Sequence, residues 1–305
     1  MGKRFMVKNS SLWARGDCVK GVRKNVERFP IFCLIAAALA SLTTRLKYCP
    51  DVLSSHFMNL ARLTRKKQQL DKFRPLPPAL VRNLDDWFRI ELTYTSNAIE
   101  GNTLTRQETA LVVEKGVTIG GKALDEHLEA TNHAKALDWI HAQLARTPPP
   151  AQITERDILR IHEIILAGIQ DEYAGRYRDI QVRIAGAEVI LPNPRKVPAL
   201  MDEFARWLQT AAPALHPVEL AAEAHYRLVS IHPFVDGNGR TARLLMNLIL
   251  LMGGYPPAII RKEDRLAYLA SLEKRQLGGA GEDYQNLIVE AVDRSLDIYL
   301  QALEK

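Results

Sequence analysis

Apolar residues at helical spacing run from Leu70 to the end of this sequence and restrict it to a mainly helical fold. In residues 78–100 they recur every three or four positions, the spacing that gathers side chains on one helix face: Leu80, Leu84, Trp87, Phe88 and Leu92. The same criterion, with capping residues, glycine and proline as start and stop signals, predicts further helices. They are expected at 105–115, 125–146, 154–168, 198–210, 217–231, 239–252, 262–275 and 283–303.

One segment, residues 180–194, breaks the helical pattern. Ile180, Val182 and Ile184 alternate with other residues, and Gly186 offers a turn before a second apolar stretch. Alternation with a period of two residues predicts a β-hairpin. The expected fold class is therefore all-α, a helical bundle that carries one β-hairpin.

The positive charge of the chain is concentrated near its N-terminus. Residues 1–70 hold 14 Lys or Arg and 3 Asp or Glu, a net charge of +11, whereas the whole chain carries +6, so the remainder carries −5. The isoelectric point near 9.2 therefore describes the first segment and not the body. It does not indicate nucleic-acid binding, and we expect no specific nucleic-acid partner.

The cysteines, Cys18, Cys33 and Cys49, all lie in this first segment. They are odd in number and have no paired spacing, which argues against a disulfide framework and against a zinc site. A reducing compartment suits such a chain best, and we expect a cytoplasmic location.

The apolar run at 31–42 raises the alternative of a membrane or secretory leader within residues 1–50. The run is shorter than the ~20 residues of a bilayer span, and its basic lead is long for a signal peptide. We expect residues 1–63 to be a basic leader that is disordered or precedes the true start. Residues 64–150 then form an N-terminal helical region, and residues 151–305 a catalytic core.

The run from His232 to Arg243, HPFVDGNGRTAR, lies between two strongly apolar helical segments. A loop that leads into a helix exposes backbone N–H groups and the positive end of the helix dipole to an anion. Gly237 and Gly239 allow the backbone to approach that anion closely. Arg240 and Arg243, three residues apart, project from one helix face, and guanidinium groups suit phosphate oxygens.

Two further groups in this run suggest chemistry as well as binding. Asp236 offers one hard oxygen ligand, which suits Mg²⁺ held mainly by phosphates and water. His232 can take a proton near neutral pH. Each group alone has a plainer interpretation as a cap, a turn or a solvated face, but together they describe a phosphate cradle with a metal and a base. Attack of a hydroxyl on a nucleotide phosphate suits that set.

The run resembles the Fic signature HPFx(D/E)GNGRxxR at every defined position. The resemblance to the Fic family extends to Ala174–Arg178, to the expected hairpin, which resembles the family's target-docking flap, and to about residues 64–303. It implies transfer of AMP from ATP to a Ser, Thr or Tyr hydroxyl of a target protein, with ATP as co-substrate and Mg²⁺ as cofactor.

The resemblance also implies roles for single residues. His232 would be the general base, Asp236 the metal ligand, and Arg243 the grip on the γ-phosphate. Phe234 would anchor the loop. The implied nucleotide-binding positions are Asp236, Gly237, Asn238, Gly239, Arg240, Thr241, Ala242 and Arg243 in the run, Ile184, Ala185, Gly186 and Ala187 in the flap, and Tyr268 and Gln276 beside the adenine.

The segment from Ser96 to Asn102, SNAIEGN, resembles the inhibitory motif (S/T)xxxE(G/N) of the same family. A helix that ends in glutamate before a C-cap glycine is common by itself, but it gains meaning beside the Fic signature. The resemblance implies an inhibitory set of Ser96, Glu100 and Gly101. In it Glu100 pairs with Arg243 and so occupies the guanidinium meant for the γ-phosphate.

Other functions stay open at this point. The chain could mainly remove AMP, or transfer another phosphate-linked group such as UMP or phosphocholine. Relatives that phosphorylate replace the second glycine of the signature, and this chain keeps Gly239. A DNA-binding or adaptor protein on a Fic fold is the non-enzyme alternative. Expected partners are ATP, an unidentified target protein, the chain itself as a substrate, and a second copy in a homodimer.

Overall fold

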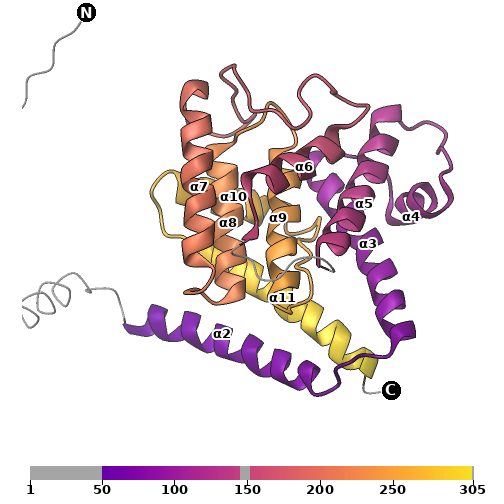
Figure 1. Ribbon diagram of the computed structural model, residues 1–305, viewed down its shortest axis with the longest axis vertical. Coiled ribbons are helices and arrows are strands. Elements are labelled where there is room, and N and C mark those ends of the chain that lie inside the picture. Colours follow the sequence, from indigo (N-terminus) through magenta and orange to yellow (C-terminus); the bar gives the residue numbers. More distant parts are fainter. Residues whose placement is uncertain (1–49, 145–151, 304–305) are drawn as a thin grey trace, which may run out of the picture. The chain divides into compact units, whose positions relative to one another are not determined.

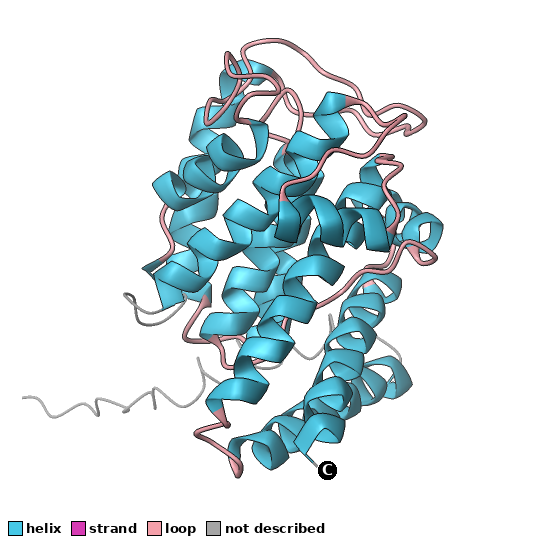
Figure 2. Cartoon of the chain, turned by 90° about the vertical axis from the view of Figure 1, so that its right-hand side faces the viewer, coloured by secondary structure: helices cyan, strands magenta, loops and turns pink. Residues whose placement is uncertain are grey.

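The computed structural model describes residues 50–144 and 152–303, with backbone alone for 50–58. Over these residues the regular structure is helical, and no strand is present (Figures 1 and 2). The chain from Pro50 onward forms one compact unit. The cysteines, the apolar run at 31–42 and the expected helix end at Arg146 lie outside the described residues. No helix in the described ranges is both long and apolar enough to cross a membrane.

The helices follow the predicted order closely. Their bounds are α2 (Pro50–Asp71), α3 (Pro78–Glu100), α4 (Arg106–Lys115), α5 (Leu124–Leu144), α6 (Glu155–Leu166), η2 (Pro194–Lys196), α7 (Val197–Ala211), α8 (Pro217–Ile231), α9 (Asn238–Met252), α10 (Arg265–Gln276) and α11 (Glu282–Leu303). The ends of α3 agree with the sequence prediction, because Pro78 opens the first turn and Gly101 ends the helix with a φ of 107°.

Helix α9 runs through the middle of the bundle (Figure 1). It packs against α3, α5, α6 and α8, and every residue from Arg240 to Leu250 is buried. A helix that is apolar on nearly all sides has to be enclosed on all of them. Since α9 begins within the signature run, the candidate site lies at one end of the most buried element in the described chain.

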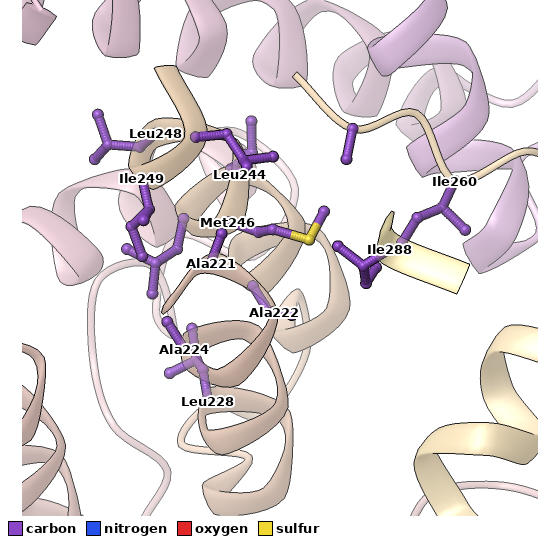
Figure 3. Packing of buried hydrophobic residues seen from close by; sticks show 14 of the residues in the cluster. Ala221, Ala222, Ala224, Leu228, Leu244, Met246, Leu248, Ile249, Ile260 and Ile288 are labelled. Carbon is purple, nitrogen blue, oxygen red and sulfur yellow. The ribbon is translucent and has the colours of Figure 1, made fainter. Parts of the chain in front are cut away.

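Helix α8 is the main neighbour of α9, and small residues allow the two to approach closely. Ala221, Ala222 and Ala224 lie on the buried side of α8, with Leu228 further along the helix, and Met246 of α9 fills the space beside them (Figure 3). A short loop joins the two helices, which makes them antiparallel neighbours. Their packing fixes both ends of the loop that carries His232.

Helix α2 was not among the predicted helices, because its many basic residues suggested a leader. Leu63 and Leu70 are nevertheless fully buried, and α2 packs along α11. The Lys66 ammonium lies 2.8 Å from a carboxylate oxygen of Asp293 and 2.6 Å from one of Asp297. At least one of the basic charges therefore faces acidic residues of α11.

The β-hairpin predicted for residues 180–194 is wrong. The segment forms two arms without regular secondary structure, joined by a turn at 185–186 and without strand pairing. A side chain takes the place of a ladder bond, because the Gln181 amide donates to the Leu191 carbonyl at 3.2 Å. Of the alternating apolar residues, Ile180 is 50% exposed and Val182 and Ile184 are only partly buried, so they form no fully buried face that would hold two strands in register.

We predict that Leu228→Ala lowers the free energy of unfolding by about 2–5 kcal/mol, because Leu228 is fully buried and the surrounding helices cannot collapse onto the cavity. Urea titration of the wild type and the variant measures the difference. Leu266→Ala is the matched control: Leu266 is 76% exposed, and its loss should cost no more than about 0.5 kcal/mol. Equal effects of both substitutions would contradict this description of the core.

Candidate active site

His232 ends helix α8 in a left-handed backbone conformation. Its φ is 51° and its ψ is 60°, and it is the one non-glycine residue with a positive φ in the part of the chain that the structure describes. This conformation costs a residue with a Cβ about 1–2 kcal/mol. A backbone hydrogen bond from His232 to the Leu228 carbonyl, at 2.9 Å, helps to hold it. Such local strain is typical of functional positions.

The protonation state of His232 follows from its surroundings. Burial lowers the pKa of His232 to about 4, so the imidazole is neutral at pH 7. Nδ1 lies 3.3 Å from the Val229 carbonyl, which can only accept, and this assigns the ring proton to Nδ1. Nε2 then keeps its lone pair, as a general base requires.

Arg178 fastens the loop to the neighbouring flap, residues 180–194. This side chain, buried in the fold, donates from Nε to the His232 carbonyl at 2.8 Å and from Nη2 to the Pro192 carbonyl at 2.7 Å. The Arg178 backbone N–H donates to the Pro233 carbonyl at 2.9 Å. One residue therefore sets the position of the flap relative to His232.

Asn238 fixes the middle of the loop. Its Oδ1 accepts from the Phe234 backbone N–H at 2.9 Å, and its Nδ2 donates to the Phe234 carbonyl at 3.0 Å. The Phe234 ring is fully buried and stacks on His162, with ring centroids 3.6 Å apart and planes 6° from parallel. The loop is thus anchored by its backbone and by its apolar side chain.

His162, on α6, supports the loop from below. Its Nδ1 accepts from the Gly175 N–H at 3.0 Å, so Nε2 carries the proton and donates to the Asp236 carbonyl at 3.0 Å. Gly237 turns the chain above this ring with a φ of 73°, and a Cβ there would lie 3.3 Å from the His162 ring. Both the turn and the close approach require glycine.

The expected ion pair between Glu100 and Arg243 is present. Arg243 Nη2 donates to Glu100 Oε1 at 2.6 Å and to the Ser96 carbonyl at 3.0 Å, and Nε donates to the Ser96 hydroxyl at 3.0 Å. The exposed fractions of the two side chains differ: 6% for Arg243 and 38% for Glu100. The cation is fixed in the interior, whereas its carboxylate partner is open to replacement from the solvent side.

Gly239 lies directly beside this pair. A Cβ at this position would collide with Glu100 Oε1 and would lie 2.9 Å from Arg243 Nη1. Any larger residue would therefore displace the carboxylate from the first turn of α9. The bare backbone here allows the contact with Glu100, and the approach of an anion at the same place stays a prediction.

Arg240 is the second buried cation of the cradle. Its Nη1 donates to Glu129 Oε1 at 2.7 Å and its Nη2 to Asp236 Oδ2 at 3.1 Å, while the buried Nε has no partner in the described residues. Glu129 in turn accepts from the Asn102 side-chain amide at 2.9 Å. The segment Ser96–Asn102 thus contacts Arg243 directly and Arg240 through Glu129.

Asp236 is the candidate metal ligand, and its carboxylate is half exposed. Oδ1 accepts from the Gly237 N–H at 2.6 Å. The described residues contain no group of three or more His, Cys, Asp or Glu side chains that could hold a metal. A single exposed carboxylate fits Mg²⁺, which takes one or two carboxylates together with phosphate oxygens and water.

The remaining predicted positions lie around this centre. Thr241 and Ala242 are fully buried, and the Thr241 N–H donates to the Gly237 carbonyl at 2.9 Å, so their contact with a nucleotide stays a prediction. The turn at 184–187 is linked to α10, because the Glu188 N–H donates to a Glu273 carboxylate oxygen at 2.7 Å. This hydrogen bond holds the flap close to α10.

Tyr268 and Gln276, both on α10, were predicted to lie beside an adenine. Tyr268 is 1% exposed, with its hydroxyl 2.7 Å from His225 Nε2. The Gln276 amide lies 3.3 Å from the Ser230 hydroxyl, two residues before His232. Their contact with an adenine stays a prediction.

The sequence alone does not single out four residues of the site, namely His162, Glu129, His225 and Arg178, the last of which lies in the run Ala174–Arg178. The sequence offers one weak signal, a polar residue within an otherwise apolar helix face, as with His162 between Ile161 and Ile165. Such residues are seldom fully buried without a partner.

Comparison with known proteins finds similarity in the region that contains the site. Residues 152–250 match the Fic/DOC family. The chain is 35% identical over 275 residues to the "Protein adenylyltransferase Fic" of Drosophila virilis, covering 90% of this chain and 55% of that protein. The chain is 37% identical over 263 residues to the protein of the same name from Drosophila melanogaster, covering 86% of this chain and 52% of that protein. The chain thus spans about half the length of these relatives.

Solved structures agree in fold. A fragment of Fic-1 from C. elegans superposes with a TM-score of 0.75 at 32% identity, covering 89% of this chain and 78% of that one. A Fic domain containing signaling protein from Bacteroides thetaiotaomicron gives a TM-score of 0.71 at 33% identity, covering 81% of this chain and 97% of that one.

We predict that acid weakens the fold partly through His162. Burial lowers the pKa of His162 to about 4, below the ~6.5 of an unfolded chain. As pH falls from 6.5 towards 4, the unfolded state binds the proton first, so up to about 1.4 kcal/mol of stability is lost per pH unit. His162→Gln keeps a donor and an acceptor but does not titrate.

Urea titrations at pH 7, 6 and 5 test this prediction. The free energy of unfolding should fall less steeply with acid in His162→Gln than in the wild type. Equal slopes would show that His162 does not bind its proton differently in the two states.

Proposed function

The chain belongs to the Fic/DOC family, and on that premise we propose that it is a protein adenylyltransferase restrained by its own Glu100. It moves AMP from ATP to a Ser, Thr or Tyr hydroxyl of a target protein. The observation that carries this proposal is the arrangement at the start of α9: a neutral His232 with a free Nε2, next to two buried arginines, one of them occupied by Glu100.

The residues have separate tasks in this reaction. Nε2 of His232 takes the proton of the target hydroxyl, whose oxygen attacks the α-phosphorus of ATP. The bond from that phosphorus to the bridging oxygen breaks, and pyrophosphate leaves. The rate comes mainly from positioning and from charge stabilisation by fixed groups. Arg240 and Arg243 supply that charge without reorganising, because both are buried and hydrogen-bonded.

Asp236 is the residue that would hold Mg²⁺ with the nucleotide phosphates. The ion would neutralise phosphate charge and help to orient the leaving group. Its carboxylate is half exposed and follows directly on the loop that Asn238 and His162 hold in place.

Glu100 restrains the reaction by occupying Arg243. The γ-phosphate of ATP needs that guanidinium in order to place the α-phosphate in line with the target hydroxyl. A dianionic phosphate and a carboxylate compete for one buried cation, and the carboxylate is already in place. Because Glu100 is 38% exposed, its release requires a change in α3 and not an opening of the core.

Removal of AMP is the main alternative activity, and transfer of another phosphate-linked group is the next. Mass spectrometry of a target after incubation with the protein separates them, because the first lowers the target mass and the second adds a group other than AMP. An adaptor role without catalysis predicts that no group is added or removed.

Other parts of the proposal rest on the family resemblance. They are modification of the chain by itself, a homodimer, Tyr268 and Gln276 beside the adenine, and the backbone of 184–187 as an edge for the target. A cytoplasmic location rests instead on the cysteine pattern. The division into a leader at 1–63, a helical region at 64–150 and a core at 151–305 also stays a prediction.

We predict that Glu100→Gly raises AMP transfer at least about tenfold. The charge-assisted hydrogen bond that Arg243 now gives to Glu100 becomes available to ATP, and one such bond corresponds to about that factor. Incorporation of label from α-labelled ATP, into the chain itself and into lysate proteins, measures it. Glu100→Gln keeps the size of the side chain and removes its charge, so it should give an intermediate rate. No gain in labelling for either variant would refute the restraint.

We predict that His232→Ala in the Glu100→Gly background abolishes transfer while ATP still binds, because only the base is lost. Asp236→Asn in that background, or chelation of divalent metal, should also stop transfer, but through weaker binding of the nucleotide. Calorimetric titration with ATP distinguishes the two effects. Full transfer by the His232→Ala double variant would exclude the imidazole as the base.

A further inference from the structure

A cavity of about 460 Å³ lies between α3, α11 and the segment 259–263, apart from the phosphate cradle. Trp87 and Tyr94, two helical turns apart, line it from one face of α3. Ser96, which accepts a hydrogen bond from Arg243, lies on the opposite face of the same helix. The volume is typical of small-molecule sites, and the reaction described above uses none of the groups that line the cavity.

Positive charge is concentrated around this cavity, although residues 71–305 as a whole carry a net charge of −5. Four cations and two carboxylates line it, which gives a net charge of +2: Arg106, Arg261, Lys262 and Arg294 against Glu91 and Glu263. Arg261 and Lys262 are exposed, and neither forms an ion pair within residues 50–144 and 152–303. The cavity is therefore a basic site on an acidic body.

The surroundings of Arg294 indicate that these cations are not neutralised by the protein. Its one ion pair in the described part of the chain is long, with 3.4 Å between Nη2 and Asp264 Oδ2. Burial and the nearby charge of Arg261 both lower the pKa of Arg294. Two like charges that face one cavity repel each other, and an anion placed between them removes that cost.

The buried carboxylate of Glu91 does not oppose such an anion, because it is already paired. Only 8% of its side chain is exposed, and Arg106 Nε lies 2.5 Å from its Oε1. The Arg106 guanidinium also lies over the Tyr94 ring, 5.2 Å from the centroid. Among the lining groups, the charges left to attract a ligand are thus those of Arg261, Lys262 and Arg294.

Trp87 gives the cavity a flat aromatic wall. Its side chain is 42% exposed although it is large and apolar, and its ring meets Phe88 at 86°, with the centroids 5.0 Å apart. Such an indole is a suitable surface for a planar ring, and stacking on an aromatic side chain strengthens the binding of a nucleobase about fivefold or more. An aromatic wall beside unpaired cations suits a ligand that carries both a base and a phosphate.

We propose that this cavity is a second ligand site, which binds a nucleoside monophosphate. Arg261, Lys262 and Arg294 bind the phosphate, and the base stacks on Trp87. A phosphate monoester carries about two negative charges near pH 7, which matches the net charge of +2 around the cavity. The site is independent of the proposed reaction, since none of these residues belongs to the phosphate cradle.

The test follows the indole N–H signal of Trp87 in ¹H–¹⁵N spectra of the full chain, with Trp87→Phe used to assign that signal. Titration with AMP should shift it in a saturable way. Adenosine, which lacks the phosphate, and ribose 5-phosphate, which lacks the base, should each bind at least about fivefold more weakly than AMP. The signals of Trp139 and Trp207 show that each protein is folded.

Joint substitution of Arg261→Ala and Lys262→Ala should weaken the binding of AMP at least about tenfold, as expected for the loss of one charge-assisted hydrogen bond or more. The matched control is joint substitution of Arg195→Ala and Lys196→Ala. These are the same two residue types, also consecutive and exposed, but they lie on η2 and do not line the cavity. The affinity for AMP should not change in the control.

Three results would overturn the proposal. A Trp87 shift that persists unchanged without Arg261 and Lys262 would show that AMP acts from the phosphate cradle. Equal affinities for AMP and ribose 5-phosphate would exclude stacking of a base. Binding of a tetraglutamate peptide in place of AMP would assign the basic surface to an acidic protein partner. A saturable AMP shift together with absent AMP transfer would contradict the proposed function alone.

Discussion

The site depends on one buried positive charge. Arg243 lies in the first turns of α9, where only 6% of its side chain reaches solvent, and a charge taken out of water must be given partners by the protein. The structure supplies them from the end of α3, in Ser96 and Glu100. The last turn of α3 therefore lies against α9 for a reason beyond apolar packing.

Helix α9 is both the centre of the core and the floor of the site. Its apolar part is enclosed by α8 and by the helices around it, so its first turn has little freedom to move. The loop before it is held by Arg178, His162 and Asn238, all of which bond to its backbone. The entropy of ordering the phosphate cradle is therefore lost during folding and not at the moment of binding.

The bounds of α3, α8 and α9 could be predicted because proline, glycine and apolar spacing act through neighbouring residues. Helix α2 was missed because its charges hid the few leucines that pack on α11, and the hairpin failed because alternation without a buried face sets no register. The supporting residues of the site could not be found in this way. His162 meets its loop partner 74 positions along the chain, Arg178 meets its partner after 54, and Arg240 meets Glu129 across 111. Only the folded arrangement of helices brings such residues together.

The absence of a side chain at Gly239 has a consequence for how this protein can change by mutation. The space that a Cβ would need is filled by the Glu100 carboxylate, and the same bare backbone borders the anion cradle. A substitution at 239 would thus free Arg243 and obstruct its ligand in a single step. On the proposed function, a gain of AMP transfer through loss of restraint is open at position 100 but not at position 239, where a side chain would both meet the Glu100 carboxylate and narrow the cradle.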